Sequence, residues 1–171
     1  MLETERLLLR KIKKEDAPAI YNNWAKDKEV TKFLTWNPHE NVEQTEKIVD
    51  LWLEEYKNPK THRFGIVLKE TNELVGMIDV VNYIDDCPEI GYVLSKNYWG
   101  KGIMTEACIK FCEYLFEQGF NKLIIKAHKD NIGSNIVIKK SGFTYTHEET
   151  KPCSKVKPEL VVTNNYEMIK K

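Results

Sequence analysis

Two glycines, Gly100 and Gly102, stand one residue apart between a short apolar run, Ile90 to Leu94, and a segment with helical periodicity. Glycine lets the backbone approach a ligand closely, and the free N–H groups of a first helical turn point toward an anion. The order strand, glycine loop, helix therefore predicts a site for a phosphate group. The helical face is marked by apolar residues at positions 104, 107, 108, 111, 112 and 115.

Spacing argues against two common nucleotide-binding loops. A Walker A loop needs Gly-x4-Gly-Lys-Ser/Thr, and this loop lacks that spacing. A dinucleotide fingerprint needs a third glycine, where this chain has Thr105. It also needs an acidic residue about twenty positions further on, where the chain has Leu123-Ile124-Ile125. A nucleotide-binding oxidoreductase is therefore disfavoured.

Three separated motifs resemble the GCN5-related N-acetyltransferase (GNAT) superfamily. Residues 97–102 are similar to its acetyl-CoA loop, Gln/Arg-x-x-Gly-x-Gly/Ala, with Asn97 in place of Gln or Arg. Residues 4–10, Thr-Glu-Arg-Leu-Leu-Leu-Arg, resemble the opening of the branch that acetylates the N-termini of ribosomal proteins. Asn131-Ile-Gly-Ser-Asn135, followed by Gly142-Phe143, resembles a later element of the same branch. The three motifs span nearly the whole chain.

The resemblance implies a fold and an activity. The fold would be an α/β GNAT domain, one domain over residues 1–171, with a mixed, mostly antiparallel, splayed sheet between two layers of helices. The activity would be transfer of an acetyl group from acetyl-CoA to a primary amine by direct attack. The acceptor implied is the N-terminal amine of a ribosomal or other protein. The alternatives are a small-molecule amine or antibiotic and, from another class, a noncatalytic acyl-CoA-binding module.

The resemblance also assigns residues to acetyl-CoA. Backbone N–H groups of the loop and first helical turn would hold the pyrophosphate, and Trp99 would cover the loop from outside. The pantetheine arm would bond to the strand that ends at Leu94, where a backbone N–H would polarise the thioester carbonyl. Such a donor is often worth about 3 kcal/mol. The implied contacts are Tyr92, Val93, Leu94, Asn97, Trp99, Gly100, Lys101, Gly102, Ile103, Met104, Thr105, Asn131 and Ser134.

Two catalytic roles remain to be filled. Ser134 is the candidate for an acid, or hydrogen-bond donor, to the departing thiolate, although a serine there also serves simply to begin a helix. Relatives outside this branch use a tyrosine at the position of Ile138, which excludes that mechanism here. The predicted base is Glu89, because a carboxylate is the usual solution and period-two alternation places it on one face with Gly91 and Val93.

Two other residues remain candidates for the base. Asp79 is the runner-up, because an acid in the otherwise apolar stretch 77–81 needs an explanation. His128 lies close in the chain to the acetyl-CoA elements.

Composition limits the partners and the compartment. Among 171 residues, 26 Lys and Arg balance 26 Asp and Glu, so a nucleic acid or an anionic membrane is not expected as a partner. The chain has neither an apolar run long enough to span a bilayer nor a signal peptide, so a soluble cytoplasmic protein is expected. The oligomeric state is left open, a homodimer included. The four cysteines lack metal-type spacing, so no metal is predicted, and Cys108 and Cys112 are expected to be buried free thiols.

The elements that position these residues follow from periodicity and turn chemistry. A right-handed parallel βαβ unit is expected around the glycine loop, with Gly119 ending its helix. Aromatic residues at 24, 33, 36 and 52 either shape the acceptor pocket or, as burial preferences favour, fill the core. Strands are predicted at 4–10, 63–68, 74–82, 90–94, 123–127, 143–149 and 160–169, and helices at 16–24, 41–56, from 104 onward and 131–140.

Overall fold

The computed structural model describes residues 1–171, and its strands form one eight-stranded sheet in the order β1-β2-β3-β4-β5-β6-β8-β7. Only the pair β5 and β6 is parallel, and every other pair of neighbours is antiparallel. The prediction of a mixed, mostly antiparallel sheet is confirmed. The strands are β1 Leu2–Glu3, β2 Leu7–Arg10, β3 Arg63–Leu68, β4 Glu73–Ile84, β5 Cys87–Leu94, β6 Lys122–His128, β7 Thr144–Pro152 and β8 Leu160–Ile169.

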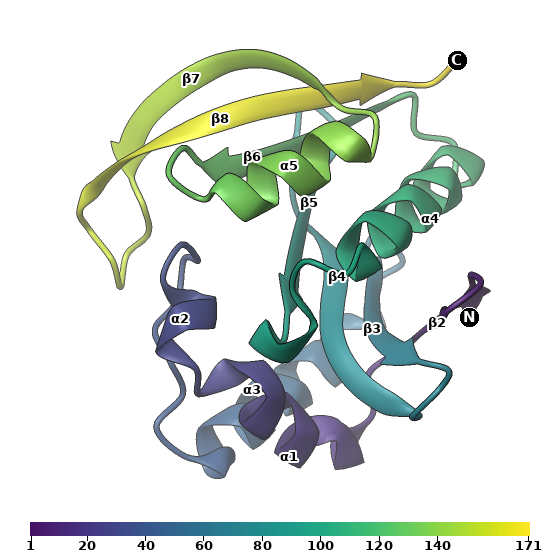
Figure 1. The fold of residues 1–171 in the computed structure, drawn as a ribbon, viewed down its shortest axis with the longest axis vertical. Helices are drawn as coiled ribbons and strands as arrows, with labels where there is room; N and C mark the ends of the chain where they lie inside the picture. Colours follow the sequence, from purple (N-terminus) through teal and green to yellow (C-terminus); the bar gives the residue numbers. More distant parts are fainter.

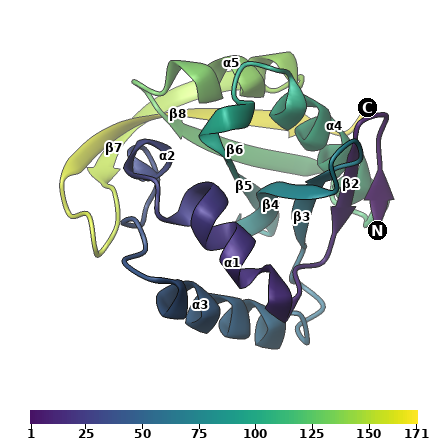
Figure 2. The ribbon, with the colours of Figure 1, turned by 60° about the horizontal axis from the view of Figure 1, so that its bottom comes forward.

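Helices cover both faces of the sheet (Figures 1 and 2). One face carries α4 (Ile103–Glu117) and α5 (Ile132–Lys140), and the other carries α1, α2 and α3. Each face has its own apolar core: the larger lies beneath α4 and the smaller around Trp24 and Val49. The three remaining helices are α1 Ala17–Ile20, which a π-helical turn extends to Ala25, α2 Lys28–Thr31 and α3 Val42–Glu55.

Alternation along the strands separates these two cores. In β5, Ile90 and Leu94 belong to the core under α4, whereas Val93 packs against the core on the opposite face. In β6, the buried residues Leu123 and Ile125 also belong to the core under α4. Side chains therefore alternate between the core under α4 and the face that carries α1 to α3, as the period of two requires.

Three helix ends have ordinary capping chemistry, and a fourth differs. Asn41 caps α3 and Asn131 caps α5, each accepting a hydrogen bond from a backbone N–H three residues later. Gly119, at φ 102°, ends α4 in the left-handed conformation. Asp16, the first residue of the helix predicted at 16–24, does not cap it but turns its carboxylate toward Arg10, at 2.8 Å, and toward the N–H of Lys13. Pairing with a charged group displaced the capping bond.

The remaining differences concern where elements begin and two short elements that were missed. The strand predicted at 4–10 begins only at Leu7, as β2, and the two-residue β1 before it was not predicted. Helix α2, Lys28–Thr31 with the cap Asp27, was not predicted either. Strand β5 begins three residues earlier than predicted, because Asp85 and Asp86 adopt φ of 50° and 65° and form a tight turn after β4. That turn contains no glycine, so the sequence carried no strong signal for it.

Two side-chain predictions are confirmed. Cys108 and Cys112 are buried free thiols in the core under α4. Trp24 is fully buried in the core, Trp36 and Trp52 are partly buried against the same cluster, and Phe33 packs on His128 instead. No helix has the length and apolarity needed to cross a membrane.

Candidate active site

Strands β5 and β6 separate soon after they meet. They pair at only two positions, Glu89 with Ile124 and Ile90 with Ile125, although the strands are eight and seven residues long. Beyond Ile90 they diverge, as Figure 1 shows for β5 running away from β6. The result is a gap in the middle of the sheet, bounded by residues 92–94 and 126–128.

The backbone of β5 offers hydrogen-bonding groups to this gap. The bond from Ser95 N–H to the Val75 carbonyl, 2.8 Å, sets which residues face β4. Because the pairing alternates in an antiparallel ladder, Val93 faces β4, whereas the backbones of Tyr92 and Leu94 face the gap. Of the three predicted strand contacts, two therefore line the gap with their backbone. The Leu94 carbonyl already accepts a bond from Trp99 Nε1 at 2.9 Å.

The glycine loop lies where β5 ends and α4 begins. Gly100 and Gly102 have φ of 74° and 76°, a conformation that favours glycine. Helix α4 starts at Ile103, and the N–H groups of residues 100–105 donate to no backbone carbonyl. This run of free donors at a helix N-terminus is suited to a phosphate group.

The side chains predicted around the loop lie on its outside. Asn97 is exposed on a 3-10 turn, and Lys101 is exposed with its ammonium over the Tyr98 ring. Trp99 is 47% exposed, and its indole N–H is bonded to the end of β5. Thr105 is half-buried in the first turn of α4. The backbone, rather than any one side chain, therefore forms the centre of the loop.

Arg6 braces this loop from the N-terminal end of the chain. Its Nη1 donates to the Lys101 carbonyl at 2.9 Å, and its Nε donates to Glu106 at 2.8 Å. Thr4 donates to the same carboxylate. Burial acts to raise the pKa of Glu106, but the hydrogen bonds from Thr4 and Arg6 outweigh it and lower that pKa. The sequence motif identified the segment but not this contact.

Ser134 lies in the first turn of α5 and is held by its neighbours. Its N–H donates to Asn131 Oδ1 at 3.2 Å, and its Oγ lies 2.7 Å from the Tyr92 hydroxyl. The buried amide of Asn135 then locks the helix to the sheet, because its oxygen accepts from Tyr166 and its nitrogen donates to the His128 carbonyl. Helix α5 therefore presents Ser134 to the gap from a fixed position.

The three candidate bases have different environments. Asp79 pairs with the buried Arg63 at 3.1 Å, and burial raises its pKa despite that charge. Glu89 lies at the closed end of the gap, on the face opposite α4. Its negative charge acts to raise the pKa of Lys126 on the neighbouring strand. His128 accepts from the N–H of Asp130 through Nδ1 at 3.1 Å. By the period of two, all three side chains lie on the face opposite α4, and His128, which packs on Phe33 with ring centroids 4.9 Å apart, lies at the far end of the gap.

The structure adds charged residues that sequence reasoning missed on the face with Glu89. Lys126 of β6 lies 3.8 Å from Glu149 of β7, which also pairs with Lys151 at 3.0 Å. Burial, and next the side-chain contact with Lys151, lower the pKa of Lys126. These residues are distant in the chain, and only the strand order brings them together.

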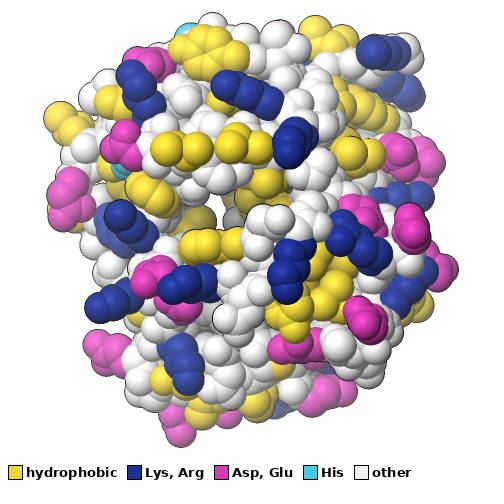
Figure 3. All heavy atoms as spheres, in the orientation of Figure 1, with side chains coloured by type: hydrophobic (Ala, Val, Ile, Leu, Met, Phe, Trp, Pro, Cys, Tyr) yellow, Lys and Arg dark blue, Asp and Glu magenta, His cyan; other side chains and the backbone are white.

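An arch closes one side of this face. The loop between β7 and β8 bonds to the segment after α2: Ser154 Oγ donates to the Thr35 carbonyl at 2.7 Å, and Lys157 Nζ donates to those of Thr31 and Leu34 at 2.7 and 3.0 Å. Figure 3 shows the surface hollowed between the half that carries α5 with the β7–β8 hairpin and the half that carries α2 and α3.

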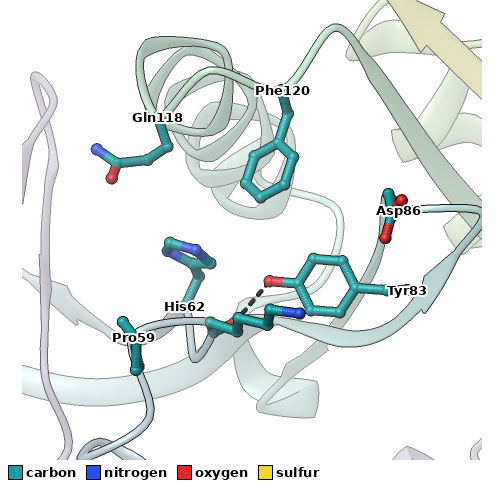
Figure 4. Close-up of a pocket in the computed structure, with 7 residues that line it drawn as sticks. Pro59, His62, Tyr83, Asp86, Gln118 and Phe120 are labelled. Carbon is teal, nitrogen blue, oxygen red and sulfur yellow. Dashed lines mark hydrogen bonds between the residues drawn. The ribbon is translucent and has the colours of Figure 1, made fainter.

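A separate pocket of about 320 Å³ lies at the C-terminal end of α4, opposite the glycine loop (Figure 4). Tyr83 crosses it and donates to the Lys60 carbonyl at 2.6 Å. It shares no residue with the gap. Its lining is Pro59, Lys60, His62, Tyr83, Asp86, Gln118 and Phe120.

Comparison with known proteins points to one family. Residues 6–144 match the family model of the acetyltransferase (GNAT) domain. The uncharacterized N-acetyltransferase p20 of Bacillus licheniformis is 32% identical over 158 residues, 88% of each chain. The crystal structure of a GNAT-family acetyltransferase from Bacillus anthracis superposes with a TM-score of 0.84 and 27% identity over 98% of this chain and 97% of that one.

A second solved structure has the same fold at lower identity. It is an acetyltransferase from Salmonella typhimurium that modifies the N-terminal serine of 50S ribosomal subunit protein L7/L12. It superposes with a TM-score of 0.84 and 22% identity, covering 98% of this chain and 97% of that one.

Proposed function

Because this chain belongs to the GNAT acetyltransferase family, we propose that it transfers the acetyl group of acetyl-CoA to a primary amine by direct attack within a ternary complex. One observation carries the proposal: a gap between two parallel strands opens beside a glycine loop whose N–H groups are free. A ligand with a pyrophosphate at one end and a thin amide-containing arm at the other fits both features.

The donor binds in three parts. Its pyrophosphate accepts hydrogen bonds from the N–H groups of residues 100–105, at the positive end of the α4 dipole. Its pantetheine arm enters the gap and bonds to the backbones of Tyr92 and Leu94 in the manner of a strand. The acetyl group then reaches the face that carries Glu89.

The chemistry needs a polarised carbonyl, a free amine and a stabilised thiolate. A backbone N–H of β5 stabilises the oxyanion, which contributes about 3 kcal/mol in comparable sites. Glu89 accepts the proton that the amine loses, directly or through a water. Ser134, in the first turn of α5, donates a hydrogen bond to the sulfur as it leaves.

The acceptor that we propose is the N-terminal amine of a ribosomal or other protein. The arch between the β7–β8 loop and residues 31–35 bounds the acceptor face, so an acceptor must enter with a narrow end. A free chain terminus has that shape. Support also comes from the motif at residues 4–10 and from the fold shared with the Salmonella enzyme.

Ligand-induced stabilisation tests the donor. Acetyl-CoA, CoA, NAD and ATP are compared at equal concentration by thermal shift, where a ligand at a hundred times its Kd adds about 2.7 kcal/mol of stability. Stabilisation by acetyl-CoA and CoA alone is expected. A larger response to NAD or ATP, or none to CoA, would contradict the proposal.

Two glycine variants make this test specific. Gly102→Ala strains a left-handed residue in the loop and is expected to abolish the response to CoA. Gly119→Ala introduces the same kind of strain at the other end of α4 and serves as the matched control, because its stability falls while its response to CoA persists.

Thiol release identifies the acceptor. Peptides with a free N-terminal amine are compared with the same peptides blocked at that amine but containing lysine, and with small amines and aminoglycosides. Release only with free N-termini is expected. Release only with small amines would replace the proposed acceptor, and no release despite CoA binding would favour a noncatalytic acyl-CoA-binding module.

A further inference from the structure

Tyr92 and Ser134 meet beside the gap although they come from different elements. Tyr92 lies on β5, with its ring against the core under α4, and Ser134 lies in the first turn of α5. The two hydroxyl oxygens are 2.7 Å apart, and the Tyr92 hydroxyl is also 3.3 Å from the Ser134 carbonyl. The phenol hydroxyl of Tyr92 is therefore the hydrogen-bond partner of the Ser134 hydroxyl.

The chemistry of the two hydroxyls favours one direction for this hydrogen bond. A phenol is far more acidic than an alcohol and is the better donor, so Tyr92 donates and Ser134 Oγ accepts. Burial raises the pKa of Tyr92, so the donor keeps its proton at working pH. The Ser134 hydroxyl hydrogen is then free to point elsewhere, and donation through a chain of hydroxyls strengthens each bond.

No side chain of α5 takes the place of Tyr92 as the hydrogen-bond partner of Ser134 Oγ. Ile138, one turn further along the helix, is fully buried in the core and has no polar atom. Asn131 and Asn135 fix the backbone of the first turn, but neither bonds to Ser134 Oγ. The rotamer and polarity of Ser134 Oγ therefore depend on Tyr92.

We propose that Tyr92 is a positioning residue that holds Ser134 as the hydrogen-bond donor to the departing CoA thiolate. The inference rests on the proposed acetyl transfer. In that step the amine nitrogen bonds to the carbonyl carbon, the carbon–sulfur bond breaks, and its electron pair moves to sulfur. The amine loses its proton to the base, Ser134 donates a hydrogen bond to the sulfur, and the thiolate is protonated from solvent after release.

A pair of ligands isolates this role from packing. CoA and desulfo-CoA differ only in the thiol, so the ratio of their Kd values measures recognition of sulfur. The ratio is determined by calorimetry over a pH series for the wild type and for Tyr92→Phe, Ser134→Ala and the double variant. The wild type is expected to prefer CoA increasingly as the thiol ionises, and Tyr92→Phe to reduce that preference about fivefold, as for loss of one hydrogen bond.

The double variant decides whether the two hydroxyls act together. Tyr92→Phe is expected to have no further effect in the Ser134→Ala background, because the tyrosine acts through the serine. Tyr83→Phe is the matched control, since its hydroxyl bonds to the Lys60 carbonyl at the other end of the sheet. It is expected to leave the ratio unchanged.

Two results would overturn the inference. Equal weakening of CoA and desulfo-CoA by Tyr92→Phe would make Tyr92 a packing residue. An undiminished effect of Tyr92→Phe without Ser134 would remove the coupling. Failure of the wild type to bind either ligand would instead overturn the proposed function, and this inference with it.

Discussion

Arg6 and Glu106 are 100 positions apart in the chain and form a 2.8 Å ion pair at the first turn of α4. The same guanidinium donates to the Lys101 carbonyl, so it joins the glycine loop to the helix that follows it. A Cβ added at Gly102 would lie 3.4 Å from Arg6 Nη2, which shows how closely the brace approaches the turn. The N-terminal segment is thus part of the frame of the phosphate site.

Removing the Arg6 side chain is expected to weaken CoA binding. Arg6→Ala frees the Lys101 carbonyl and lets the loop fluctuate, so the Kd for CoA should rise about threefold to tenfold. Calorimetry measures it, and Glu5→Gln, an exposed neighbour, is the control. An unchanged Kd for Arg6→Ala would show that the loop holds its conformation without Arg6.

The same ion pair predicts a pH dependence of stability. The folded pKa of Glu106 lies below its ordinary value of 4.5, because the hydrogen bonds from Thr4 and Arg6 outweigh the effect of burial. Its contribution to the free energy of unfolding is therefore complete above about pH 4.5 and is lost as the pH falls through the folded pKa. Urea unfolding of the wild type and Glu106→Gln should differ most near neutral pH and converge in acid. A gap that widens in acid would contradict this sign.

The buried amide of Asn135 is expected to be important for stability. Asn135→Ala leaves the Tyr166 hydroxyl without its acceptor and removes one of the two hydrogen bonds to the His128 carbonyl, which keeps that from the Asn131 N–H, so the free energy of unfolding should fall by about 3 kcal/mol. Ile136→Ala, at a 47% exposed position on the same helix, should change it by only about 0.5 kcal/mol. Chemical denaturation compares them, and similar losses would mean that the amide network adds nothing.

The arch predicts an effect on the acceptor alone. Lys157→Met keeps the apolar stem but removes the bonds to the carbonyls of Thr31 and Leu34. Amide exchange of residues 31–35 should accelerate, and the KM for the acceptor should change while the Kd for CoA does not. Lys155→Met, at an exposed position of the same loop, is the control. Equal effects of the two variants would contradict a role for the arch.

Three isosteric or near-isosteric variants separate the candidate bases. Glu89→Gln is expected to lower turnover about a hundredfold and leave acetyl-CoA affinity intact. Asp79→Asn should mainly reduce stability, because it removes the nearer of the two carboxylates that pair with the buried Arg63 and leaves only Glu55, at 3.8 Å. His128→Asn should have a small effect. Steady-state kinetics with an acceptor from the thiol-release screen measures all three, and unchanged kinetics for Glu89→Gln would remove it from the mechanism.

Local patterns were enough to predict most of the elements. The helical stripe after Gly102, the helices that begin after Asn41 and Asn131, and the strand β6 each depend on residues within a few positions of one another. Backbone conformation and amphipathic faces are local properties, so spacing reveals them. The exceptions were short or unmarked: α2 is a single turn, and the Asp85–Asp86 turn lacks glycine.

By itself the sequence determined the order of the longer elements, the glycine loop and, through three separated motifs, the family. Only the tertiary structure decided which polar groups meet: Arg6 with Glu106, Tyr92 with Ser134, and Lys126 with Glu149. The physical reason is that the burial of many apolar side chains stabilises the strand order, and strand order then brings distant residues together. No local spacing encodes those pairs. The extent of β5–β6 pairing, which opens the gap, is likewise a property of the whole sheet.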